Sequence, residues 1–306
     1  MSIEYHLCQE CFEVPAIKLL ALSRLKTAVD NYLVSNQKQQ ASSISLSYRA
    51  NECGEVVYVS NVAFVFSKVV SNPPLEIARD FANVYSQVHP HKQDFIITVE
   101  PPGFLQLKLT ELKLAQWLQC LQFLPLSLAD FPSPEYSNLL ENNSGLFAIQ
   151  YAHARCYSLM QLAQSEGLIT LEEISANKFQ SQNIGLNTAP QDFSILVVNH
   201  PQPLPWLHYR QQRQFGHSAE DKLIIELIKV VDDFYSSTGL NLDYWVKVAL
   251  NLSQAFAGFY SHCRIFGQTN PQIASLVSAR LSLVFATYVV LKLLLQRLGV
   301  FAPRSL

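Results

Sequence analysis

The sequence predicts an α+β fold in which a small α/β domain precedes an all-α helical bundle. Three observations predict it. Within residues 1–125, apolar residues at helical spacing alternate with short β-branched runs. Residues 126–143 are rich in Pro, Ser, Asn and Asp and keep no sustained period, which is typical of a linker. Within residues 144–306, apolar residues recur mostly at three- and four-residue steps, as expected of packed helices.

Helices and short strands alternate in the predicted N-terminal domain. The residues Glu-Cys-Gly at 52–54, between two β-branched runs, indicate a hairpin, and Pro101-Pro102-Gly103 separates two further strands. Pro74 marks the first turn of a helix because its ring pre-sets φ. The expected helices cover residues 14–34, 61–70, 74–84 and 110–121, and the expected strands cover 44–49, 56–59, 94–100 and 104–109.

The second domain is predicted to contain longer helices and one insertion. The insertion, at about 178–217, is rich in Gln, Pro and Asn and contains one strand-like run at 193–198. A connection of this length is either a functional loop or a mobile one. The expected helices cover residues 144–164, 220–236, 243–266 and 271–298.

Charge limits the kind of partner that the whole chain attracts. The formal net charge is −2 and the pI is about 6.4, so no global basic field draws in a polyanion and any nucleic-acid site must be a local patch. Residues 145–306 carry 12 Lys and Arg against 10 Asp and Glu, whereas residues 1–144 carry the other 10 against 14. The two parts stand at +2 and −4, and the helical part is therefore the more plausible polyanion binder.

Other classes of site and partner are disfavoured by the sequence. The apolar run 281–291 is eleven residues long, well below the roughly 20 that span a bilayer, so we expect a buried helix and no membrane partner. The N-terminus lacks a basic segment followed by an apolar run, which predicts a cytoplasmic protein with reduced cysteines. Cys8 and Cys11 form a C-x-x-C that could be half of a zinc site or a redox pair, but no second cysteine pair accompanies them. We therefore expect two ordinary thiols, no metal and no other cofactor.

Several motifs resemble one protein family. The run Tyr-Ala-His-Ala-Arg at 151–155 is similar to the opening helix of the DALR anticodon-binding domain of arginyl-tRNA synthetases. The segments 259–264, 279–281 and 298–303 resemble that domain's F-Y-x-x-C, A-R-L and L-G-x-x-A-P motifs, in the same order. Segments 60–63, 72–78 and 102–107 resemble the family's N-terminal additional domain. The last residues, Arg304-Ser305-Leu306, depart from the usual E-R-M, which puts contacts on the anticodon side in doubt.

The resemblance leaves out the catalytic part of the family. In arginyl-tRNA synthetases a class I catalytic domain with H-I-G-H-type and K-M-S-K-S-type motifs lies between the two resembling ends, and here only residues 126–143 occupy that place. Neither motif occurs in the sequence, and no Gly-rich loop with a Lys partner is present to hold ATP. We therefore expect no catalytic residues and no small-molecule substrate. The expected function is that of a non-catalytic paralogue that binds tRNA or a tRNA-like RNA.

In the N-terminal domain, the resemblance implies that Phe104 and Gln106 approach the D-loop corner of tRNA and read an unpaired base. Alternation along the strand places Phe104, Gln106 and Lys108 on one face and the leucines at 105, 107 and 109 on the other. The leucine face is then the core, and Phe104 is expected to be exposed. The alternative is that Phe104 is itself a core residue.

In the helical domain, the candidate RNA contacts are Tyr151, His153, Arg210 and Arg213. The resemblance implies that Tyr151 or His153 stacks on an anticodon base, although the two side chains point about 160° apart on an ideal helix. The alternative is that both pack against neighbouring helices. Arg210 and Arg213 lie in a stretch that interleaves basic, amide and aromatic residues from Trp206 onwards, for which a solvated loop is the alternative.

A competing function is a protein-interaction scaffold that reuses the appended domains of a synthetase. The near-neutral charge and the Pro-rich insertion favour it, and a protein partner is possible. Retention of two RNA-facing modules on one chain favours tRNA binding instead.

Overall fold

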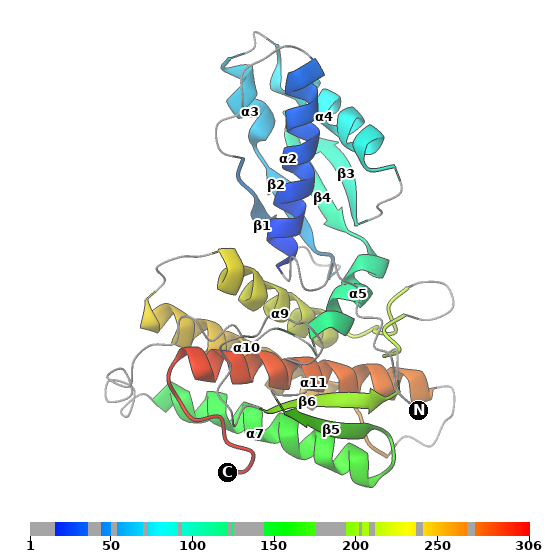
Figure 1. Cartoon of the computed structure of the whole chain (residues 1–306), viewed down its shortest axis with the longest axis vertical. Coiled ribbons are helices and arrows are strands. Elements are labelled where there is room, and N and C mark those ends of the chain that lie inside the picture. Colours follow the sequence, from blue (N-terminus) through cyan, green and yellow to red (C-terminus); the bar gives the residue numbers. More distant parts are fainter. Residues whose placement is uncertain are drawn as a thin grey trace. The chain divides into compact units, whose positions relative to one another are not determined.

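The computed structural model describes residues 16–35, 44–49, 54–69, 72–90, 94–121, 124, 144–175, 194–201, 204–207, 212–236, 241–267 and 273–306. They form two compact units (Figure 1). One contains residues 16–116 together with 234–236, and the other contains the described residues of 117–233 and 237–306. The division falls within helix α5 (Glu111–Leu121). The expected linker, 126–143, lies outside the described residues.

The N-terminal unit contains every helix and strand that the sequence predicts for it. Its strands form an antiparallel sheet in the order β1-β2-β4-β3, so β1 and β3 are the edge strands. The elements in chain order are α2 (Ile17–Ser35), β1 (Ser47–Arg49), β2 (Val57–Ser60), α3 (Val62–Ser67), α4 (Pro74–Val88), β3 (Phe95–Glu100), β4 (Phe104–Leu109) and the first part of α5.

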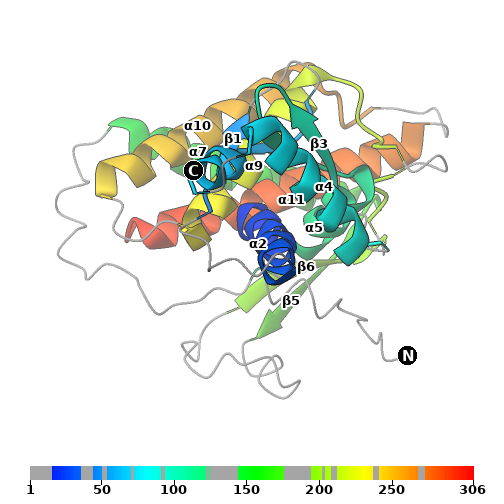
Figure 2. The ribbon, with the colours of Figure 1, turned by 90° about the horizontal axis from the view of Figure 1, so that it is seen from above.

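The core of this unit lies on one side of the sheet. Figures 1 and 2 show α2 on that side, and α2 packs against α4, which in turn contacts β3 and β4. The leucines of β4 at 105, 107 and 109 are buried there, as the alternation predicts. Phe81 of α4 packs edge-to-face against Tyr32 and Phe66, with ring centroids 5.0 and 5.3 Å apart. The opposite side of the sheet carries the polar side chains of β4.

Two of the family-like motifs meet at Gly103. The turn between β3 and β4 lies against Pro74 at the start of α4, and a Cβ atom at Gly103 would stand 2.7 Å from the Pro74 Cβ atom. Gly103 also has φ +151°, which side-chain-bearing residues rarely adopt. Glycine is therefore required for the turn and for its close approach to α4.

The second unit is a helical bundle with a small sheet. Helix α11 (Ala274–Arg297) packs against both α7 (Ser144–Ser165) and α10 (Leu242–His262). By length and composition α11 is apolar enough to cross a membrane, and 72% of its most apolar window is buried inside the protein. Residues 281–291 are all buried, which confirms the expected buried helix. Among the described residues, the unit also contains α9 (Ser218–Ser236) and the last part of α5.

The expectation of an all-α bundle misses a two-stranded antiparallel sheet. Strand β6 (Ser194–His200) corresponds to the strand-like run noted in the insertion, and it pairs with β5 (Thr170–Ser175). Strand β5 was not predicted because two adjacent glutamates, Glu172 and Glu173, interrupt its apolar pattern. Strand β5 is stabilised by its pairing with β6 and by the ion pair between Glu173 and Arg304. Both contacts involve residues far away in the chain, so the sequence of β5 alone does not reveal them.

Of the three cysteines that the structure describes, one departs from expectation. Cys156 and Cys263 are free and buried, whereas Cys120 is disulfide-bonded. The prediction that all six cysteines are reduced is therefore wrong for Cys120. Cys8 and Cys11 lie outside the described residues.

Candidate nucleic-acid interface

An exposed aromatic pair lies on α7. Phe147 is 64% exposed and Tyr151, one turn later, is 54% exposed. Their rings stack with centroids 6.3 Å apart and an interplanar angle of 25°. The other side of the helix carries the buried residues Ile149 and Ala152, so the fold presents both rings to solvent. Aromatic rings held in this way offer sequence-tolerant platforms for unpaired bases.

A cationic group extends this pair towards α10. Arg155 lies one turn beyond Tyr151, and its Nη2 donates a hydrogen bond of 2.6 Å to the hydroxyl of Tyr260. The Arg155 Cζ atom is 5.0 Å from the Tyr260 ring centroid, and Tyr260 stacks on Phe256 with centroids 6.4 Å apart. Phe147, Tyr151, Arg155 and Tyr260 together are called the aromatic surface below. It combines stacking platforms with one cation, which is the combination that binds single-stranded nucleic acid.

His153 does not take part in this surface. It is 1% exposed, its ring stacks on Tyr288 at 4.6 Å, and its Nδ1 atom lies 2.7 Å from the carbonyl oxygen of Pro303. Burial lowers the pKa of His153 to about 4, so the neutral ring donates its Nδ1 hydrogen to that carbonyl. His153 therefore packs against neighbouring segments and is not exposed for stacking on a base. Tyr151 is exposed because the two residues point to different sides of the helix.

The C-terminal segment is bound to α7 and β5. Gln150 donates a hydrogen bond of 2.9 Å to the carbonyl oxygen of Phe301. Arg304 forms a 2.6 Å ion pair with Glu173, and its Cζ atom lies 5.4 Å from the ring centroid of Tyr157. Arg304, which differs from the residue usual at this place in the family's C-terminal motif, thus contacts Glu173 and Tyr157 within the helical unit.

The basic and aromatic stretch of the insertion is not an open patch where it is described. Arg213 forms a 2.6 Å ion pair with Asp221, and its side chain is only 14% exposed. Trp206 is buried, and its Nε1 lies 3.3 Å from the Oε1 atom of Gln119. Arg210 lies outside the described residues. Arg213 therefore holds the segment before α9 in place, and its charge is already matched.

On the N-terminal sheet, Phe104, Gln106 and Lys108 share one face, as predicted. Each of the three side chains is half-buried and has a partner. Phe104 packs on Phe64 of α3, with ring centroids 4.8 Å apart. The amide of Gln106 donates to Glu100 over 2.5 Å, and Lys108 pairs with Glu55. Phe104 is thus less exposed than expected, since α3 comes close to the start of β4.

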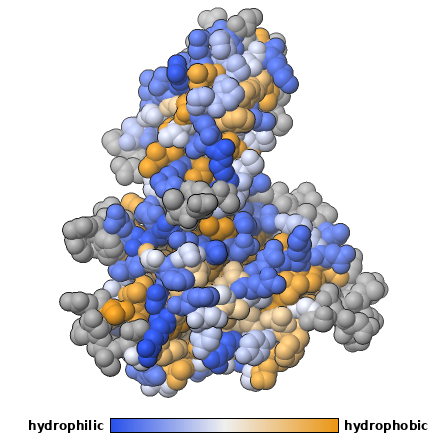
Figure 3. Space-filling view, turned by 180° about the vertical axis from the view of Figure 1, so that it is seen from behind, coloured by the Kyte–Doolittle hydropathy of each residue, from blue (hydrophilic) through white to orange (hydrophobic). Residues whose placement is uncertain are grey.

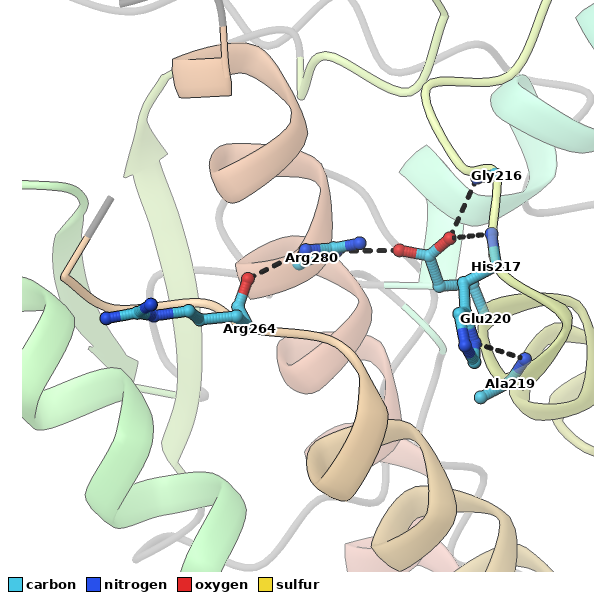
Figure 4. A network of polar contacts seen from close by, with 6 residues as sticks. All are labelled: Gly216, His217, Ala219, Glu220, Arg264 and Arg280. Atoms are coloured by element: carbon cyan, nitrogen blue, oxygen red, sulfur yellow. Dashed lines mark hydrogen bonds and ion pairs between the residues drawn. The ribbon is translucent and has the colours of Figure 1, made fainter. Parts of the chain in front are cut away.

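A buried carboxylate connects α9 with α11 and with the segment after α10. Glu220 is fully buried, and one of its oxygens accepts hydrogen bonds from the backbone N–H groups of Gly216 and His217, at 2.9 and 2.8 Å (Figure 4). The other oxygen pairs with Arg280 at 2.6 Å, and Arg280 also donates to the carbonyl oxygen of Arg264. The network joins the start of α9, the segment just after α10 and the second turn of α11. The A-R-L segment and the segment 259–264 are thus in contact, because Arg280 of the first donates to the carbonyl oxygen of Arg264 in the second.

Cys263 belongs to the same region but is no reactive thiol. Burial, together with the nearby charge of Glu220, raises its pKa to about 11. In the part of the chain that the structure describes, no group of three or more His, Cys, Asp and Glu side chains could hold a metal ion.

Three members of the aromatic surface, Phe147, Arg155 and Tyr260, were missed as candidates from the sequence. Phe147 precedes Tyr151 by four residues, which places both on one side of a helix, and that spacing could have found it. Tyr260 lies in the F-Y-x-x-C segment, but its meeting with Arg155, 105 residues away, is a tertiary contact that no local pattern contains.

The helical unit is similar to one family of domains and to one class of proteins. Residues 207–306 match the DALR anticodon binding domain. The arginine–tRNA ligase of Frankia alni is 29% identical over 168 residues, which cover 54% of this chain and 24% of the ligase. The ligase of Salinibacter ruber is 27% identical over 162 residues, 53% of this chain and 22% of that protein. That of Streptococcus agalactiae is 34% identical over 96 residues, 30% of this chain and 16% of that protein.

The chain thus spans about a quarter or less of the length of these ligases. The similarity lies over its C-terminal half, and it is consistent with the lack of a catalytic domain between the two ends. The likeness of residues 1–125 to the family's N-terminal domain stays a prediction. Residues 207–306 are thus a DALR anticodon-binding domain, and the C-terminal half of the chain is similar to arginine–tRNA ligases.

Proposed function

We propose that this protein binds tRNA or a tRNA-like RNA through the aromatic surface and does not aminoacylate it. The observation that carries the proposal is the exposed, stacked pair Phe147 and Tyr151 next to the Arg155–Tyr260 hydrogen bond. Burial of such rings is normally favourable. Two large exposed rings held at 25° to each other on a helix are therefore suited to a partner with flat, polar-edged groups. Unpaired RNA bases are partners of this kind.

The charge of the surface fits the same partner. Arg155 is the cation of the surface, and its guanidinium is aligned by the hydroxyl of Tyr260. An aligned guanidinium loses little further freedom when it binds a phosphate, and it can stack as well as form hydrogen bonds. With a near-neutral chain overall, binding through a few such groups predicts moderate affinity that falls only modestly as salt rises, because each phosphate contact adds less than about one unit to the slope of log affinity against log salt.

The proposal is tested by two variants of α7 and one control. Phe147→Ala and Tyr151→Ala each remove a stacking platform and are expected to weaken tRNA binding by about 1 to 3 kcal/mol near 0.1 M salt. Leu162→Ala removes an exposed apolar side chain from the same helix without removing a ring, and should leave binding unchanged. Fluorescence anisotropy with labelled tRNA measures all three. Equal affinities for all of these proteins would reject the aromatic surface as the RNA site.

The non-catalytic part of the proposal has its own test. Support comes from the two family-like ends, which are separated only by residues 126–143, and from the lack of H-I-G-H-type and K-M-S-K-S-type motifs in the sequence. Purified protein is expected neither to exchange pyrophosphate into ATP with arginine nor to charge tRNA. Turnover that follows the protein through purification would overturn this part while leaving RNA binding intact.

A further inference from the structure

The sheet of the N-terminal unit has one face that lies opposite α2 and α4, called the open face below. Helix α3 touches this face at Phe104, whose ring packs on Phe64. In the register of the sheet, Arg49 of β1 and Lys108 of β4 both align with Val57 of β2, so the two cations lie in one row across that face. Phe104 and Gln106 precede Lys108 at alternate positions of β4 and share its side. Figure 3 shows the protein from the side away from α2, where polar and apolar residues of this unit intermix.

Each cation of the open face has a carboxylate partner. Arg49 pairs with Glu100 at 2.6 Å, and this contact joins β1 to β3, the two edge strands, across β2 and β4. The same Glu100 oxygen accepts the hydrogen bond from Gln106, and Lys108 pairs with Glu55. The hydrogen bonds from Arg49 and Gln106 lower the pKa of Glu100, so its charge is retained. The polar groups of the open face are thus engaged with one another, and the face is locally neutral.

These contacts are exposed, and that decides what they can do. The side chains of Arg49 and Glu100 are 48% and 38% exposed, and those of Lys108 and Glu55 are 41% and 33% exposed. Ion pairs at such exposure contribute little to folding and weaken as salt rises. These ion pairs therefore contribute little to the stability of the fold, and another anion can replace the carboxylate in each of them.

The open face has features that a nucleic acid would use. Lys108 and Arg49 can each take a phosphate, and the amide of Gln106 on the same strand can pair with the edge of a base. Strand β4 thus presents three groups at alternate positions of one face: the half-buried ring of Phe104, the amide of Gln106 and the ammonium of Lys108. The two carboxylates occupy the positions at which phosphates would otherwise meet the cations.

We propose that Glu55 and Glu100 keep the open face neutral as internal competitors of RNA phosphates. RNA engages Arg49, Gln106 and Lys108 only after it displaces the two carboxylates. The face thereby rejects weak, non-specific polyanion binding and admits an RNA that is already held elsewhere on the protein. This inference rests on the proposed RNA binding, for which the aromatic surface supplies the first contact.

The test is the double variant Glu55→Gln with Glu100→Gln, which removes both charges and keeps the size of the side chains. Freed cations should bind tRNA about tenfold or more tightly at 0.1 M salt, and the plot of log affinity against log salt should steepen by about 1.4 to 1.8, as two added phosphate contacts require. Adding Arg49→Gln and Lys108→Gln to the double variant should abolish this gain. Unchanged thermal melting and circular dichroism verify that the variants are folded.

The matched control is Glu76→Gln with Glu166→Gln. It changes the net charge by the same amount at exposed glutamates, one on α4 and one in the helical unit. If the parent protein binds tRNA and the open-face variant gains no more affinity or salt dependence than this control, the inference is overturned and the proposed function stands. If parent and variants all fail to bind at low salt, the proposed function fails as well.

Discussion

Glu220 and Arg280 form an ion pair, with 2.6 Å between the glutamate Oε1 and the arginine Nε, although 60 residues separate them in the chain. Glu220 is fully buried, and the side chain of Arg280 is 13% exposed. The pair joins α9 to α11 while the second oxygen of Glu220 satisfies two backbone N–H groups ahead of α9. Every oxygen of this buried carboxylate therefore has a partner, which is the condition under which a charge can be kept in a protein interior.

Removal of Arg280 should be severely destabilising. Arg280→Met leaves the buried charge of Glu220 without its cation, and such a loss typically lowers the free energy of unfolding by about 3 to 5 kcal/mol. Urea unfolding followed by circular dichroism measures the change. Arg264→Met is the control, because the network uses only the backbone carbonyl of Arg264 and its side chain is exposed. The control should lose less than about 1 kcal/mol, and equal losses in both variants would contradict this account.

Acid should destabilise the helical unit through His153. Its pKa is lowered to about 4 in the folded protein, mainly by burial, and stands near 6.5 in the unfolded chain. Because the unfolded chain binds the proton first, stability is unaffected above about pH 6.5 and falls as pH drops towards 4. The loss amounts to about 3 kcal/mol by the end of this range.

The variant His153→Phe isolates this effect. It keeps a ring against Tyr288 but cannot titrate, and it loses the hydrogen bond to Pro303. We expect it to be less stable than the parent at pH 7 and to lose less stability between pH 6.5 and pH 4.5, as measured by urea unfolding at each pH. Parallel stability curves for parent and variant would show that His153 does not cause the acid sensitivity.

Two glycines should respond oppositely to alanine. Gly103→Ala places a methyl group 2.7 Å from the Cβ atom of Pro74 at φ +151°, which we expect to cost about 2 to 3 kcal/mol of unfolding free energy. Gly258→Ala lies inside α10 with nothing within 4 Å, and should gain about 0.5 to 1 kcal/mol from helix propensity. Thermal and urea unfolding of both variants check the signs. A neutral Gly103→Ala would mean that the turn adapts without strain.

Much of the architecture follows from local pattern. The alternation in residues 104–109 predicts both the limits of β4 and the side on which its leucines are buried. The continuous apolar run 281–291 predicts the buried stretch of α11, because a helix that is apolar all round must be covered on every side. Strand β5 escaped prediction because its stability comes from pairing with β6, about 25 residues away, and the glutamates that obscure its pattern face partners such as Arg304.

For the candidate sites, the sequence by itself determined which residue types are available and which side of a helix or strand they occupy. Helical spacing already placed Tyr151 and Arg155 on one side and His153 on another, and alternation placed Phe104, Gln106 and Lys108 together. Only the tertiary structure decided which of these groups are free for RNA. Arg213, Lys108 and Gln106 each meet a carboxylate, and Arg155 meets a tyrosine more than a hundred residues away. Availability depends on these through-space partners, because a charge is neutralised by whatever lies within a few ångströms, and chain folding sets that distance.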